Sequence, residues 1–160
     1  MSDTELYFAH ENARSSQSEM ISDGVRALSN GGFLLAAAPT GIGKTAAALA
    51  SALHSSFDNH ISPDRANIIF MTGRQTQHKI VVDTVRKINS RIPDGVPKIS
   101  LVDIIGRDGM CDHVDKMTGK CDCEDGVVEE SRKSRRADLR KKLLDEPQHV
   151  DWTVKYGRAR

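Results

Sequence analysis

The sequence is poor in aromatic residues and has no long apolar run. Phe, Trp and Tyr make up 4% of its 160 residues, so a core must be built mainly from aliphatic side chains. The longest apolar run, residues 33–38, is far too short to cross a bilayer. The first residues are acidic and lack the basic start of a signal peptide. These absences predict a cytoplasmic chain with no membrane partner.

The sequence also lacks an excess of charge of one sign, and its number of cysteines is odd. Lys plus Arg number 23 and Asp plus Glu number 22, for a net charge of +1, which excludes a uniformly basic nucleic-acid-binding surface but not local patches. Three cysteines argue against a disulfide framework and favour metal ligation or reduced thiols. The 28% of charged residues is typical of a folded domain.

The order of apolar runs predicts an α/β fold. A short continuous apolar run occupies residues 33–37 and is typical of a strand covered on both faces. Two further mainly apolar stretches, residues 67–72 and 99–105, predict a second and a third strand. The intervening stretches 46–57 and 74–89 have helical patterns. This alternation predicts a parallel sheet with right-handed crossovers.

Two helices should each bury one stripe of side chains. The first is expected over residues 11–29, with Ile21, Val25 and Leu28 buried and glycines after Asn30 ending it. The helix over residues 74–89 should bury a second stripe, formed by Val81, Val85 and Ile88.

The character of the chain changes after Gly106. Residues 112–130 contain seven acids and two bases, whereas residues 131–142 contain seven bases and one acid. We therefore predict two parts, residues 1–106 and residues 107–160. The basic run could contact phosphates, although a solvated helix face is the more common explanation for such a run.

Residues 38–45 have the composition of a phosphate-binding loop. Such a loop needs a strand that ends in a glycine-bearing turn and leads into a helix, so that backbone amides and the helix dipole converge on phosphate oxygens. Gly41 and Gly43 permit the required backbone angles. Lys44 would contact the terminal phosphates, and Thr45 would offer its hydroxyl to Mg²⁺. The alternative is a glycine-rich turn with no ligand.

Three further stretches, together with this loop, resemble one enzyme family. Arg14, Gln17 and Met20 precede the loop, Arg74 and Gln77 lie in a segment that begins a helix, and residues 105–111 lead to the first cysteine. In this order they resemble the N-terminal part of an XPD/DinG-type superfamily 2 iron–sulfur DNA helicase, most like archaeal XPD. The first glycine of the strict loop pattern is Ala38 here, a variant common among helicases.

The resemblance implies a RecA-like P-loop parallel sheet, forming an incomplete first motor lobe, with the start of an iron–sulfur insert. It also implies 5′-to-3′ ATP-dependent DNA unwinding in DNA repair, with single-stranded and forked DNA as partners. Arg74 and Gln77 would touch DNA, with ordinary helix capping as the alternative. The implied ATP and Mg²⁺ ligands are Arg14, Gln17, Thr40, Gly41, Ile42, Gly43, Lys44 and Thr45, with Lys44 and Thr45 as the catalytic pair.

The cysteines Cys111, Cys121 and Cys123 are spaced C-x9-C-x-C. Thiolates suit iron–sulfur ligation, and four are normally needed. The resemblance implies that these are three ligands of a [4Fe–4S] cluster, with the fourth beyond Arg160. A zinc site that adds His113 and a set of unligated thiols are the alternatives.

The carboxylate motif of an ATP-driven motor is missing. The family's Asp-Glu-x-His motif is absent, and the pairs Glu129-Glu130 and Asp145-Glu146 lie in hydrophilic helical sequence. We therefore expect a helicase fragment that neither unwinds DNA nor hydrolyses ATP at a useful rate, and whose partner is the missing C-terminal portion. The alternatives are a stand-alone nucleotide- or DNA-binding module and, less well matched, a small P-loop kinase.

Overall fold

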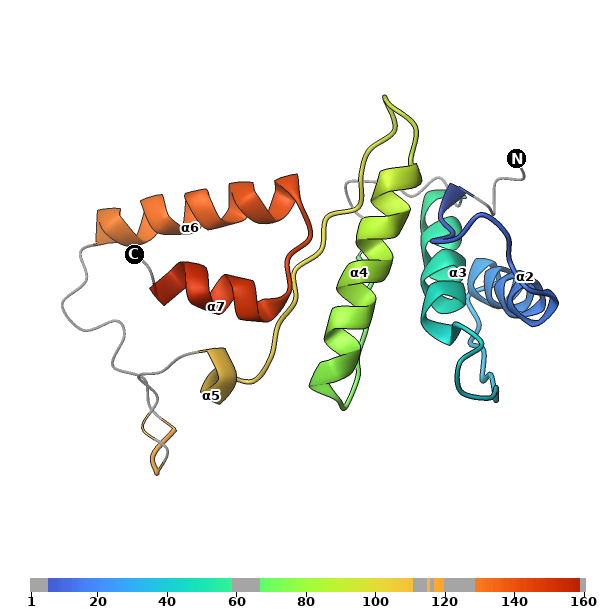
Figure 1. Ribbon diagram of the computed structural model, residues 1–160, viewed down its shortest axis with the longest axis horizontal. Coiled ribbons are helices and arrows are strands. Elements are labelled where there is room, and N and C mark those ends of the chain that lie inside the picture. The colour runs from blue at the N-terminus through green and yellow to red at the C-terminus, as the bar shows by residue number, and fades with distance from the viewer. Residues whose placement is uncertain (1–5, 59–66, 111–114, 116, 120–128, 159–160) are drawn as a thin grey trace. The chain divides into compact units, whose positions relative to one another are not determined.

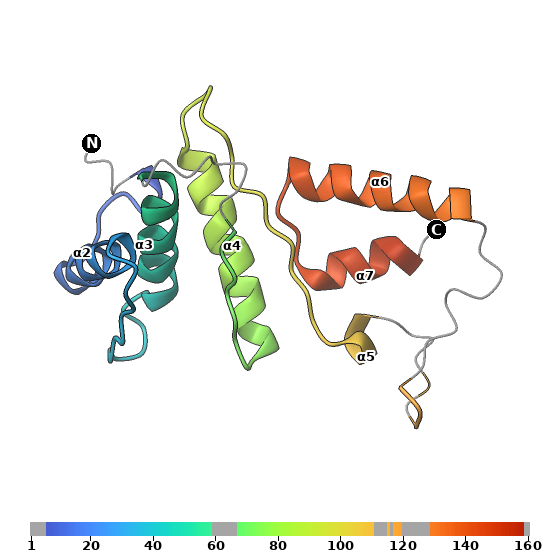
Figure 2. The same cartoon turned by 180° about the vertical axis from the view of Figure 1, so that it is seen from behind.

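The computed structural model describes residues 6–58, 67–110, 115, 117–119 and 129–158. It divides into two compact units, one formed by residues 1–73 and 83–98 and the other by residues 74–82 and 99–160 (Figure 1, Figure 2). Each unit is described separately below. The boundary that the sequence predicts between residues 106 and 107 stays a prediction.

The first unit is organised around two helices that pack against each other, α2 (Ser15–Ser29) and α3 (Lys44–Asp58). Gly24 of α2 faces Ser51 of α3, and a Cβ on Gly24 would lie 2.6 Å from Ser51 Oγ. The Ser51 hydroxyl is itself buried, lying 2.9 Å from the carbonyl of Ala47 and 3.4 Å from that of Ile21. The missing side chain at Gly24 therefore lets the two helix backbones approach closely.

The inner face of α3 is built from small and branched aliphatic residues. Ala is the strongest helix former and leaves room for a close neighbour. Near the end of the helix, the ring of Phe57 stacks on that of Tyr7 with centroids 4.8 Å apart. The buried aliphatic side chains of α3 are Ala46, Ala47, Leu49, Ala50 and Leu53.

The predicted end of the first helix is confirmed, but the helix begins at Ser15 instead of residue 11, and its predicted apolar stripe is only partly correct. α2 ends at Ser29, and Gly31 follows with a φ of +67°, which glycine adopts without steric cost. Ile21 is buried, whereas Leu28 is exposed. The buried positions of α2 are instead Gln17, Ile21 and Gly24.

Helix α4 (Gln75–Arg91) confirms the second predicted stripe. Val81, Val85 and Ile88 are all buried. A turn follows the helix, with Gly95 at a φ of +88° and the amide of Val96 donating to the carbonyl of Pro93.

The second unit contains a short helix, α5 (Arg107–Met110), and two longer ones, α6 (Glu129–Asp145) and α7 (Val150–Arg158). α7 runs back alongside α6 in the opposite direction (Figure 1, Figure 2). Lys142 Nζ lies 5.5 Å from the centre of the Tyr156 ring, which stacks on Trp152. These contacts tie the end of α6 to α7.

The predicted parallel sheet is wrong for the part of the chain that the structure describes. Residues 33–37, 67–72 and 99–105 form no β-strand there, and the one backbone bridge recorded joins Val102 to Gln148. The predicted α/β, RecA-like P-loop fold is therefore replaced by a helical one. All three runs also lack the predicted burial: Phe33 is 92% exposed and Leu35 is 94% exposed, Ile69 and Met71 are similarly open, and Val102 and Ile104 are more than half exposed.

The physical reason lies in what a strand requires. An apolar run can favour an extended backbone, but a strand exists only where another segment pairs with its amides and carbonyls. A run that is apolar on both faces must also be covered on both faces.

Among the described residues, no helix is long and apolar enough to span a membrane.

Gly24→Ala should destabilise the first unit although Ala is the better helix former. The added methyl group would collide with Ser51, and overpacking of this kind costs about 1–3 kcal/mol, more than the gain of about 1 kcal/mol in helix propensity. Urea unfolding followed by circular dichroism measures the difference. The control is Ser18→Ala on the exposed face of α2, which should be neutral or slightly stabilising. A more stable Gly24→Ala variant would contradict the close packing.

Burial of the Tyr7 ring predicts a loss of stability at alkaline pH. Burial raises the pKa of the Tyr7 phenol, whereas the unfolded chain ionises near the usual value of about 10. The folded state therefore retains the proton longer. The stability that the Tyr7 phenol loses on ionising is fully present below about pH 10 and is lost as the pH rises through the pKa of the folded state.

The measurement compares the free energy of unfolding of the wild type and Tyr7→Phe between pH 8 and pH 12. Phe retains the stack on Phe57 but has no ionisable proton. The wild type should lose stability more steeply above pH 10, and parallel curves would refute the assignment.

Candidate phosphate-binding site

The candidate site is built by residues 38–45, where an extended segment turns into α3. Residues 40–42 form the turn, and Gly41 and Gly43 have φ values of +85° and +83°. Side chains rarely adopt such angles, so both positions require glycine. α3 begins at the next residue, Lys44, so the first amides of the helix, which have no partner within it, lie at this turn.

Lys44 folds back under the loop. Its Nζ donates to the carbonyl oxygens of Ala38 at 2.8 Å and Pro39 at 2.7 Å. The ammonium group is thereby held beside the backbone of the same loop whose glycines turn the chain. A cation and a set of helix N-terminal amides together form an anion-binding environment.

Gln17 of α2 is the side chain that reaches this loop from elsewhere in the unit. It is only 5% exposed, and its Oε1 accepts a hydrogen bond from the backbone amide of Arg14 at 2.9 Å. A Cβ on Gly43 would collide with Gln17 Nε2. The structure therefore brings the predicted adenine-reading glutamine directly against the candidate phosphate-binding loop.

Most of the other predicted nucleotide ligands lie in or next to the same turn. Thr40 and Gly41 are exposed, Ile42 and Thr45 are half-buried, and Arg14 is exposed at the start of α2. Thr45 occupies the second position of α3, one residue after Lys44. Their proposed roles toward ATP and Mg²⁺ stay predictions.

The predicted DNA residues lie in the second unit, at the start of α4. Arg74 immediately precedes the helix and Gln77 lies in its first turn, where the Gln77 amide donates to the Arg74 carbonyl at 3.0 Å. Both side chains are exposed. A helix N-terminus of this kind suits a backbone phosphate.

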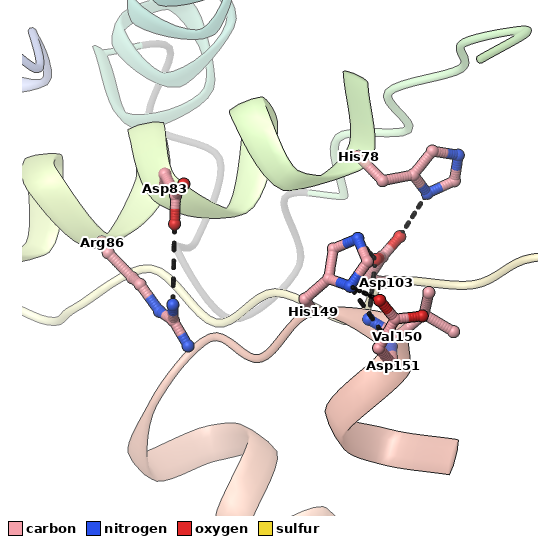
Figure 3. Close-up of polar contacts among 7 residues, drawn as sticks. All are labelled: His78, Asp83, Arg86, Asp103, His149, Val150 and Asp151. Carbon is pink, nitrogen blue, oxygen red and sulfur yellow. Dashed lines mark hydrogen bonds and ion pairs between the residues drawn. The ribbon is translucent and has the colours of Figure 1, made fainter. Parts of the chain in front are cut away.

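A buried carboxylate that the sequence reasoning missed organises the second unit (Figure 3). Asp103 Oδ1 lies 2.5 Å from His78 Nδ1 of α4, and Asp103 Oδ2 accepts a hydrogen bond from the amide of Val150 at 2.9 Å. His149 Nε2 lies 3.8 Å from the same oxygen, and its Nδ1 lies 3.3 Å from Asp151 Oδ2. Asp103 therefore joins α4, the 99–105 segment and the start of α7.

The chemistry of Asp103 follows from its position. Its carboxylate caps the N-terminus of α7, where negative charge is favoured, and orients the His78 ring through Nδ1. The available signal was a single acid within the apolar run 99–105, because a carboxylate in such a run needs buried partners. Elsewhere on α4, Asp83 and Arg86 form a separate ion pair at 3.6 Å (Figure 3).

The predicted cluster ligands Cys111, Cys121 and Cys123, and the alternative zinc ligand His113, lie outside the described residues. Within the residues that are described, no group of three His, Cys, Asp or Glu side chains is arranged to hold a metal ion. The cluster and zinc hypotheses therefore stay predictions.

No protein-family profile matches the chain, and no curated protein or solved structure shows significant similarity to it.

Two substitutions separate backbone strain from side-chain contact in the loop. Gly41→Ala should cost about 1–2 kcal/mol from its positive φ alone, because nothing surrounds that position. Gly43→Ala carries the same strain and also displaces Gln17, so it should destabilise the chain further. Urea unfolding of both variants measures the difference, and equal losses would contradict the contact between Gln17 and the loop.

Proposed function

We propose that the chain binds Mg-ATP through residues 38–45 and is the N-terminal portion of an ATP-dependent DNA helicase of the XPD type. The observation that carries the proposal is that Gly41 and Gly43 both have positive φ angles while Lys44, at the start of α3, donates hydrogen bonds to the backbone of the same loop. The turn and the lysine contacts are local, so they depend on no strand pairing.

On binding, phosphate oxygens would replace the two carbonyl oxygens as the hydrogen-bond acceptors of Lys44, and the new interaction would be stronger. The Lys44 ammonium now bonds two neutral carbonyl oxygens, whereas phosphate oxygens carry negative charge and would add Coulomb attraction to the hydrogen bonds. The first amides of α3 would complete the phosphate contacts. Thr45, at the second position of the helix, would direct its hydroxyl to Mg²⁺.

Gln17 would link the base to the phosphates. An amide side chain can accept from the adenine N6 amino group and donate to N7. Its oxygen already accepts from the Arg14 amide, but a carbonyl oxygen has two lone pairs and can accept a second bond. Arg14, which is exposed beside it, would complete the base-side contacts.

Hydrolysis needs groups that this sequence does not provide. A carboxylate must hold Mg²⁺ and orient water, and an arginine must reach the γ-phosphate from a second lobe. We therefore propose binding without useful turnover, and DNA contact through Arg74 and Gln77. The cysteines would hold a [4Fe–4S] cluster with a further ligand, and the nucleotide and reduced thiols suit a cytoplasmic location.

Lys44→Ala should weaken Mg-ATP binding by about 10- to 150-fold, because hydrogen bonds to a charged group contribute about 1.5–3 kcal/mol. Fluorescence anisotropy of a labelled ATP analogue with the full chain gives the dissociation constant. Phosphate release measured on the same sample should remain at the background rate.

The matched control is Lys87→Ala, which removes an exposed lysine of α4 and should leave the dissociation constant unchanged. Equal binding by the wild type and Lys44→Ala would overturn the nucleotide proposal. Lys44-dependent phosphate release at a steady rate would overturn the proposal that the chain lacks turnover.

A further inference from the structure

A groove of about 300 Å³ lies in the second unit, between residues 100–102 and one face of α6. Its walls are almost entirely aliphatic, and its polar lining groups are Ser100 and two arginines. The aliphatic lining residues are Val102, Leu139, Leu143 and Leu144. They belong to neither the phosphate loop nor the Asp103 cluster.

The groove leaves apolar surface open to solvent. Val102 is 62% exposed and Leu144 is 56% exposed, whereas Leu143 beneath them is buried. Val102 alternates with the inward-facing Asp103, so the extended segment that buries the carboxylate necessarily turns its valine outward. Covering such apolar surface contributes about 25 cal/mol per Å².

Two guanidinium groups border the aliphatic surface. Arg136 and Arg140 are four residues apart on α6, which places them on the same face of the helix. Neither forms an ion pair with a carboxylate in the described part of the chain. Both arginines are exposed, so the charge that the described residues place at the groove is positive.

We propose that this groove binds an acidic peptide segment of another protein, with an aliphatic side chain seated on Leu139 and Leu144 and flanking carboxylates paired with Arg136 and Arg140. Planar guanidinium groups pair with carboxylates through two parallel hydrogen bonds. An aliphatic anchor between acids matches both the apolar floor and the charge at its border.

The composition of the groove favours a peptide over a nucleic acid. Single-stranded nucleic acids bind through bases that stack on aromatic rings, and none of the described residues that line the groove is aromatic. The aromatic pair of this unit, Trp152 and Tyr156, stacks on itself with centroids 5.0 Å apart. Arginine is instead enriched at protein–protein interfaces.

The test uses the full chain and a fluorescein-labelled peptide with two leucines between pairs of glutamates. Arg136→Glu combined with Arg140→Glu should weaken binding at least tenfold, and so should Leu144→Asn, which changes an exposed side chain and leaves the fold intact. Raising the salt concentration should weaken binding, because exposed ion pairs are screened. Replacing the peptide leucines by serine should abolish it.

The matched control is Arg135→Glu combined with Lys141→Glu, which changes the charge of α6 by the same amount at residues outside the groove. It should change the affinity less than threefold. Equal losses in the two double variants would show nonspecific attraction and overturn the site. Tighter, Arg136- and Arg140-dependent binding of an oligothymidine would overturn the peptide as its occupant, and unchanged affinity in Leu144→Asn would overturn the aliphatic anchor.

Discussion

The close approach of α2 and α3 is the constraint on which the first unit depends. Gly24 has no side chain at the point where Ser51 packs against α2. The Ser51 hydroxyl lies within hydrogen-bond distance of a backbone carbonyl of each helix. The same packing brings Gln17, near the start of α2, to Gly43, just before α3. A contact between two helix backbones therefore also shapes the candidate phosphate-binding site.

The second unit depends on a carboxylate instead of a close backbone contact. Asp103 accepts from the Val150 amide and pairs with His78, so it meets the cost of burial with two partners from distant parts of the chain. Because side chains alternate along an extended segment, the same geometry exposes Val102 and opens the aliphatic groove against α6. The segment 99–105 therefore supplies both the buried carboxylate and part of the proposed peptide-binding groove.

The candidate site survives the loss of the predicted sheet because its parts are local. Positive φ angles at Gly41 and Gly43, the start of α3 and the Lys44 contacts all involve residues less than ten apart. Strand pairing, by contrast, joins segments about thirty residues apart and depends on partners along both edges. The described segments 33–37 and 67–72 have no such pairing and expose most of their apolar side chains.

The sequence by itself determined α3, α4, the end of α2 and the loop before α3. Periodicity located α4 and its buried valines, the Asn30 and glycine signal ended α2, and the glycine spacing predicted the turn before Lys44. These features depend on backbone preference and on neighbours within a few residues. Only the tertiary structure decided that the apolar runs remain unpaired, that Gln17 meets Gly43 and that Asp103 joins two histidines, because a local pattern carries no information about which distant segment will supply a hydrogen bond or cover a side chain.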